Sequence, residues 1–165
     1  MAERLIDWDG ELEMGIHEID EQHRMLVDIL NEFHEAIHQH KGTDVAERIL
    51  ERLADYTRIH FAVEESMMRL LDYPDYPEHK RLHDELIETL KDLTVKFASG
   101  KKSVNFELIH FLKMWLTKHI QENDMAYTSY FLSRGVVAKP TNTLNEERVD
   151  GFSIKKMWSK LWNES

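Results

Sequence analysis

The amino-acid sequence predicts an all-α fold, an up-down-up-down antiparallel four-helix bundle with a C-terminal extension. Apolar side chains recur at three- and four-residue steps along four stretches of the chain, which is the period of an amphipathic helix. Short connections with glycine or proline separate these stretches, so consecutive helices are expected to lie antiparallel. The 165 residues, 42% of them hydrophobic, suffice for one domain with its own core.

The first helix is expected over about residues 16–39, with Gly42 closing it. Asp44 and Glu47 have the spacing of a capping box, which predicts that the second helix opens there. Its apolar pattern continues to Leu71, after which a stretch with two prolines interrupts it.

The third helix is expected to open around Pro77 and to end at Gly100, and the fourth to start at Ser103. Beyond the fourth helix the composition becomes that of a polar linker followed by a short amphipathic stripe. We therefore expect a bundle domain over residues 1–134 and a linker with a short helix over residues 135–165.

Seven side chains that can bind a metal fall on these helices. His60 and Glu64 are four residues apart, and so are His79 and His83, so each pair projects from one face of its helix. The chain has no cysteine, so a metal here would be held by nitrogen and oxygen. The seven candidates are His23, His60, Glu64, His79, His83, His119 and Asp124.

The last two candidates do not fit a regular helix. His119 and Asp124 are five residues apart, about 500° around an α-helix, which leaves them about 140° away from each other. If both are ligands, the helix should contain a wide turn or π-bulge between them.

Charge and hydropathy exclude several classes of function. The net charge of −10 repels nucleic-acid phosphates and anionic lipids, so nucleic acid is not an expected partner. No apolar run has the length of a signal peptide or a membrane span. Together with the absence of cysteine, this predicts a cytoplasmic protein.

Over about residues 5–132 the chain resembles the hemerythrin family, in particular its single-domain bacterial members. The resemblance depends on four motifs: D-E-Q-H ending at His23, H-F-x-x-E from His60, H-x-x-x-H from His79, and H-x-x-x-x-D from His119. Each motif alone is weak, but the ordered set with these intervals is highly specific.

The resemblance implies two iron ions bridged by oxide or hydroxide. One iron would be held by His79, His83 and His119. The other would be held by His23 and His60, with an open position for O2. The two bridging carboxylates would be Glu64 and Asp124.

The resemblance also implies reversible O2 binding for carriage, storage or delivery, without catalysis. Ferritin-like di-iron enzymes use a more carboxylate-rich ligand set, so five histidines favour a carrier over an oxidase. Offsets from the ligands and the resemblance together place four residues as apolar walls of the O2 pocket, where no proton donor is expected: Leu26, Phe61, Trp115 and Leu116.

Two alternatives stay open. One is an oxidase, peroxidase or nitric-oxide-handling enzyme, which would turn over O2 and not release it. The other is an O2 sensor acting through the tail, whose stripe over residues 152–162 either folds back on the bundle or docks on a protein or membrane. The remaining histidines are assigned no role: His17, His34, His38, His40 and His110.

Overall fold

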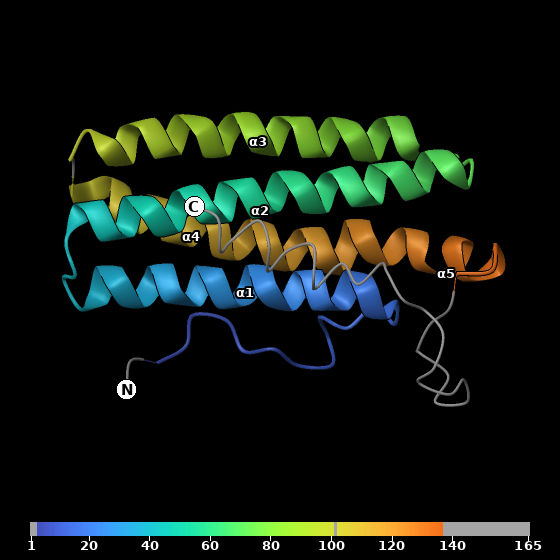
Figure 1. Cartoon of the computed structure of the whole chain (residues 1–165), viewed down its shortest axis with the longest axis horizontal. Coiled ribbons are helices and arrows are strands. Elements are labelled where there is room, and N and C mark those ends of the chain that lie inside the picture. Colours follow the sequence, from blue (N-terminus) through green and yellow to red (C-terminus); the bar gives the residue numbers. More distant parts are fainter. Residues whose placement is uncertain (1–2, 101, 137–165) are drawn as a thin grey trace, which may run out of the picture.

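The computed structural model describes residues 3–100 and 102–136, and it confirms the all-α four-helix bundle (Figure 1). Its elements are α1 (His17–His38), α2 (Thr43–Leu70), α3 (Tyr76–Ala98), α4 (Lys102–Lys118), the π-helical segment η1 (His119–Asp124) and α5 (Met125–Ser133). The last three follow one another without a break and form the fourth arm of the bundle. Helices adjacent in sequence pack together, and contacts between α1 and α4 close the bundle.

The start of α2 differs from the prediction. The helix begins at Thr43, and Gly42 precedes it with a φ of 101°, a conformation that favours glycine. Asp44 therefore lies inside the first turn, where its carboxylate pairs with Arg48 at 3.3 Å and makes no capping hydrogen bond. The predicted capping box is wrong because the glycine turn starts the helix one residue earlier. Gly42 also does not close α1, which ends at His38.

The apolar core consists of two clusters stacked along the bundle. The larger one includes Phe33 and Phe97, whose rings meet edge to face at 5.7 Å. The smaller one holds Ile19, Met68 and Tyr127, all fully buried. Ile19 lies a few residues before the candidate ligand His23, and Tyr127 lies a few residues after the candidate ligand Asp124. The candidate site therefore lies where the two clusters meet.

The segment before α1 runs alongside that helix (Figure 1). Asn31 fixes it, because its side chain accepts a hydrogen bond from the Ile6 amide at 3.0 Å and donates one to the Ile6 carbonyl at 2.9 Å. Nearer the site, the carboxylate of Asp20 accepts hydrogen bonds from the amides of Met14 and Gly15, at 2.9 and 3.0 Å. These contacts hold the start of α1 in place.

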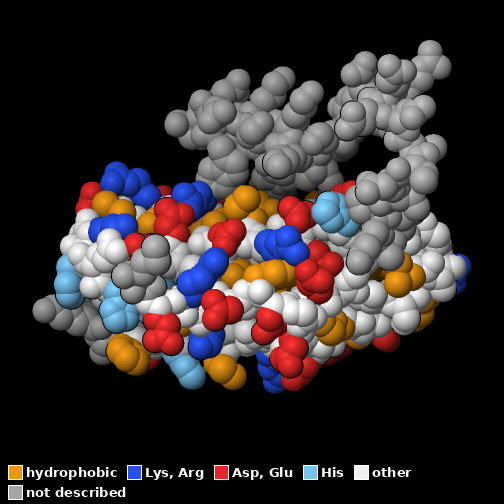
Figure 2. All heavy atoms as spheres, turned by 90° about the horizontal axis from the view of Figure 1, so that it is seen from below, with side chains coloured by type: hydrophobic (Ala, Val, Ile, Leu, Met, Phe, Trp, Pro, Cys, Tyr) orange, Lys and Arg blue, Asp and Glu red, His pale blue; other side chains and the backbone are white. Residues whose placement is uncertain are grey.

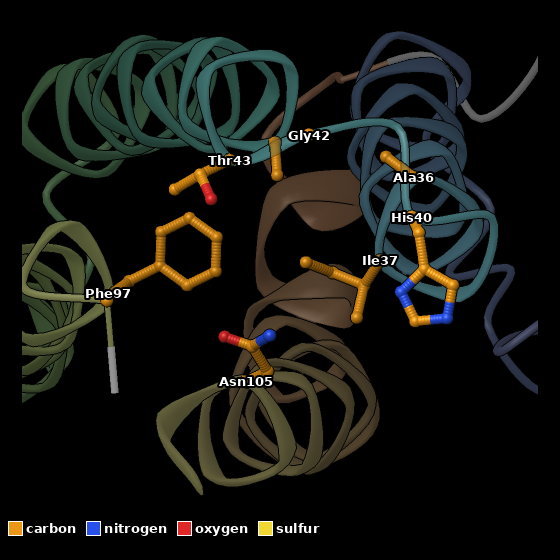
Figure 3. A pocket seen from close by; sticks show the side chains of 9 residues that line it. Ala36, Ile37, His40, Gly42, Thr43, Phe97 and Asn105 are labelled. Atoms are coloured by element: carbon orange, nitrogen blue, oxygen red, sulfur yellow. The ribbon is translucent and has the colours of Figure 1, made fainter. Parts of the chain in front are cut away.

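The face seen in Figure 2 carries acidic and basic side chains side by side, as expected for an exposed, salt-bridged surface. A pocket at the end of the bundle where α1 stops is lined by residues from the helix ends, among them Phe97 and Asn105 (Figure 3). None of the described helices is both long and apolar enough to cross a membrane. The predicted tail helix lies outside the described residues.

Candidate metal centre

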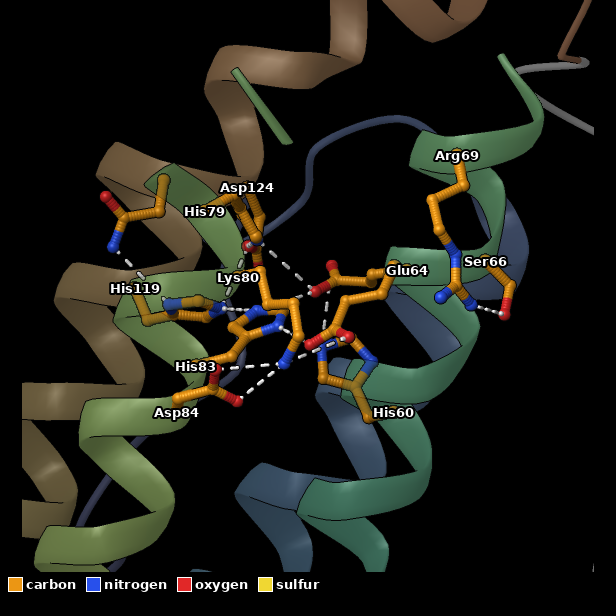
Figure 4. Close-up of polar contacts among 12 residues, drawn as sticks. His60, Glu64, Ser66, Arg69, His79, Lys80, His83, Asp84, His119 and Asp124 are labelled. Atoms are coloured by element: carbon orange, nitrogen blue, oxygen red, sulfur yellow. Dashed lines mark hydrogen bonds and ion pairs between the residues drawn. The ribbon is translucent and has the colours of Figure 1, made fainter. Parts of the chain in front are cut away.

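All seven predicted ligands come together inside the bundle, and Figure 4 shows six of them converging from α2, α3 and the fourth arm. The seventh, His23, reaches the cluster from α1. His23, Glu64 and Asp124 are fully buried, and the most exposed of the set, His79, retains only 5% of its accessible surface. Ionisable groups at such depth need a compensating charge or a metal.

The seven residues form two overlapping groups, in each of which the ligand atoms lie within 4.8 Å of one another. The group with three histidines consists of Glu64, His79, His83, His119 and Asp124. The group with two histidines consists of His23, His60, Glu64 and Asp124. Both groups contain the two carboxylates, so the arrangement is suited to two metal ions that share Glu64 and Asp124.

Each carboxylate directs its two oxygens toward different groups. Asp124 places Oδ1 3.0 Å from Nε2 of His119, and Oδ2 2.9 Å from Nε2 of His23. Glu64 behaves in the same way, with Oε2 3.3 Å from Nε2 of His83 and Oε1 3.6 Å from Nε2 of His60. A carboxylate whose two oxygens face different histidines can bridge two ions.

Most of the ligand atoms that face the centre are buried without a hydrogen-bond partner. Eight buried side-chain nitrogen or oxygen atoms in the described part of the chain lack a hydrogen bond, and seven of them belong to the candidate ligands. Leaving one such atom unpaired costs about 1–3 kcal/mol. In addition, Nε2 of His83 lies 3.3 Å from Nε2 of His119, so two ring nitrogens face a common point. The residues therefore fit a metal centre.

The protonation states of the two carboxylates agree with a metal centre. Burial raises the pKa of Glu64, and Asp124 raises it further, but neighbouring histidines led by His60 outweigh both and lower it. The pKa of Asp124 is also lowered, because His119 and other histidines overcome the effect of burial. Both carboxylates are thus anionic, as metal ligands must be.

The histidines divide into two kinds. Burial lowers the pKa of His60 to about 4, so its ring is neutral and can donate a lone pair. Burial also acts to lower the pKa of His79, but the nearby carboxylates of Asp124 and Glu64 raise it to about 9. In the metal-free protein His79 therefore holds a proton, whose place a bound cation takes.

The predicted wide turn is confirmed. Residues His119–Asp124 form a π-helix between α4 and α5. The extra residue in this turn lets two side chains five positions apart point to the same centre, which a regular α-helix does not allow.

Residues behind the ligands orient the ligand rings. These supporting residues were not predicted from the sequence. Nδ1 of His60 donates to Oε1 of Gln22 at 2.7 Å, and Nδ1 of His83 donates to Oε1 of Glu65 at 2.9 Å. Such contacts fix which ring nitrogen faces the metal. Gln22 belongs to the D-E-Q-H motif and Glu65 directly follows Glu64, but these positions alone do not tell which ligand ring each side chain contacts.

Tyr127 is a further residue that the sequence analysis missed. It is fully buried, and its hydroxyl donates a hydrogen bond to Oε1 of Glu64. Burial, reinforced by the charges of Glu64 and Asp124, raises the pKa of this phenol well above its usual value. The one available signal is its position three residues after Asp124, on the same helical face.

Two of the four predicted wall residues, Phe61 and Trp115, lie against ligand rings of this centre. Phe61 stacks on the His83 ring, with centroids 3.6 Å apart, and its ring lies 6.1 Å from that of Trp115. Trp115 in turn lies 5.9 Å from the ring of His119. Leu26 and Leu116 are buried in the larger apolar cluster. Their role as walls of an O2 pocket stays a prediction.

The fold and the site define a class: four-helix bundles with a buried histidine and carboxylate centre that can hold metal. Comparison with known proteins makes this more specific. The sequence profile of the hemerythrin HHE cation binding domain matches residues 14–130. The chain therefore belongs to the hemerythrin family.

Relatives and solved structures agree. A bacteriohemerythrin of Stenotrophomonas maltophilia (strain R551-3) is 36% identical over 123 residues, which cover 74% of this chain and 79% of the relative. A bacteriohemerythrin of Methylococcus capsulatus (strain ATCC 33009 / NCIMB 11132 / Bath) is 33% identical over 108 residues, 66% of this chain and 82% of that one. A crystal structure of wild-type hemerythrin superposes with a TM-score of 0.70 and 31% identity, covering 76% of this chain and 96% of the other.

Proposed function

We propose that this protein binds O2 reversibly at a non-haem di-iron centre, and that it serves oxygen carriage, storage or delivery. His79, His83 and His119 would hold one iron, and His23 and His60 the other. Glu64 and Asp124 would bridge the pair, together with an oxide or hydroxide. Two iron ions would supply the electrons that O2 takes on binding and accept them again on release.

The observation that carries the proposal is the unequal division of ligands around two shared carboxylates. One group has three histidines and the other has two. The group with fewer protein ligands leaves room for an external ligand, whereas the three-histidine group is more nearly complete. An arrangement of this kind suits a small ligand that binds at one end of the centre.

The surroundings of the centre favour release over turnover. No ligand is more than 5% exposed, and Phe61, which stacks on the His83 ring, is 3% exposed, so the site lies away from solvent. Water exclusion limits proton delivery to bound O2 and so limits side reactions. The hydroxyl of Tyr127 contacts the centre, but its proton is engaged with Glu64 and its pKa is raised. The phenol therefore orients the carboxylate and is a poor acid.

The first test is the iron content of the purified protein together with its visible absorption spectrum. The spectrum is recorded after reduction without air, after addition of O2, and after purging with inert gas. Two irons per chain, with a band that appears with O2 and disappears on purging, would support reversible binding. Rapid, irreversible conversion to a ferric form would contradict it and favour the enzyme or sensor alternative.

We further propose that residues 1–134 form the O2-binding unit and residues 135–165 a separate extension. Deleting residues 137–165 is expected to leave iron content and O2 affinity unchanged. A changed affinity would contradict the independence of the two parts and support a sensor that acts through the tail. The cytoplasmic location stays a prediction from the sequence.

A further inference from the structure

Four of the five histidines outside the metal centre line one groove between α1 and α4. His34 and His38 belong to α1, His40 follows that helix, and His110 comes from α4. Figure 2 shows histidine side chains grouped toward the end of the molecule where α1 stops. No role was predicted for these residues from the sequence, because they lack a core-facing position or match no family motif.

His34 and His38 repeat the geometry of a ligand pair inside the centre. They are four residues apart on α1, and their ring centroids lie 4.7 Å apart with an interplanar angle of 76°. For His79 and His83 the same spacing on α3 gives 4.4 Å and 82°. Two histidines one turn apart on a helix can chelate a single metal ion.

The type of ligand available in the groove selects the kind of ion. Its lining, within the described residues, includes Lys113 but no aspartate or glutamate. Hard cations such as Ca²⁺ and Mg²⁺ need oxygen ligands and find none from carboxylates here.

We propose that this groove is a second metal site, separate from the di-iron centre, which takes a divalent transition-metal ion with a preference for imidazole, such as Cu²⁺, Ni²⁺ or Zn²⁺. His34 and His38 form the chelating pair. His110, exposed on the facing helix, completes the site by rotation of its side chain. Rotation is required because, among the described residues, three ligand atoms meet within 4.8 Å only at the buried centre.

Cu²⁺ is the probe, since it binds imidazole most strongly in the divalent series and its electron paramagnetic resonance spectrum reports coordinated nitrogen. The full chain is loaded with iron, oxidised to the diferric form and titrated with Cu²⁺. We expect one copper per chain with nitrogen coupling, and no loss of iron. Displacement of iron by an equal amount of copper would overturn the proposal.

Substitutions then locate the copper. The double variant His34→Gln and His38→Gln is expected to bind this copper at least about 100-fold more weakly, because even residues behind the ligands contribute about 10–100-fold to metal affinity. His17→Gln, on an exposed histidine outside the groove, is the matched control and should behave as the wild type. Equal copper affinity in the double variant and the control would refute the site. An unchanged affinity in His110→Gln would refute the third ligand.

Discussion

The contact between His83 and Glu65 allows a prediction about the redox properties of the centre. The carboxylate accepts a hydrogen bond from Nδ1 of His83 at 2.9 Å, while its other oxygen lies 3.8 Å from Nζ of Lys80. The side chain of Glu65 is only 15% exposed. Glu65→Gln removes one negative charge behind a ligand of the three-histidine group and keeps an oxygen that can accept the hydrogen bond.

The size of the effect follows from the distance between the charge and the metal. A carboxylate across an imidazole from a bound iron lies about 7 Å away, and at an effective dielectric constant of about 20 the interaction is about 2.4 kcal/mol per unit charge. Partial solvent exposure halves this to about 1 kcal/mol, or about 50 mV per electron. The negative charge stabilises the ferric state, so its removal should raise the midpoint potential and weaken O2 binding about 5-fold.

The assay is a spectroelectrochemical titration of the iron-loaded protein together with an O2 binding curve. Glu88→Gln is the matched control, since Glu88 is an exposed acid paired with Lys91 at 3.3 Å. Lys80→Gln should shift the potential in the opposite direction, because it removes the positive charge beside Glu65. A potential that falls in Glu65→Gln, or that moves no further than in the control, would refute the reasoning.

Three further predictions concern the ligands, the phenol and the metal-free protein. Glu64→Ala and His119→Ala should each lower bound iron below two per chain, and full retention by elemental analysis would contradict the ligand assignment. Tyr127→Phe leaves Oε1 of Glu64 without its donor and should destabilise the metal-free protein by about 1–3 kcal/mol in urea unfolding, whereas an unchanged midpoint would show that the hydrogen bond contributes nothing. In the metal-free protein the free energy of unfolding should fall on both sides of neutrality. The pKa of His79 in the folded protein is raised to about 9, so its contribution to stability is fully present below its ordinary pKa of 6.5 and is lost as the pH rises toward 9. His60, with its folded pKa lowered to about 4, opposes folding increasingly as the pH falls from 6.5 toward 4. A steady rise in stability from pH 5 to 9 would contradict the sign predicted for His79, and a steady fall over the same range would contradict the sign predicted for His60.

Local patterns in the sequence predicted most of the fold and the ligands of the buried centre. Apolar periodicity predicted the helices, because an amphipathic helix must turn one face to the core. The five-residue interval between His119 and Asp124 predicted the π-helical turn, since no regular helix brings both to one side. These features depend on spacing along one helix.

Contacts between helices could not be predicted in this way. Gln22 on α1 supports His60 on α2, and Tyr127 on α5 holds Glu64 on α2. Each pairing depends on how two helices are rotated against each other. The predicted capping box at Asp44 failed for a local reason, because the backbone of Gly42 starts the helix earlier than the side-chain pattern indicates.

The π-helical turn also sets the direction in which the side chains of α5 point. One residue corresponds to about 100° of rotation, so deleting a residue such as Gln121 would turn the whole of α5 by that angle. Tyr127 and Phe131, both fully buried, would then swing out of the smaller apolar cluster. The length of this segment therefore couples metal binding to the packing of the last helix, and insertions or deletions here should be tolerated far less than equal changes in the loops.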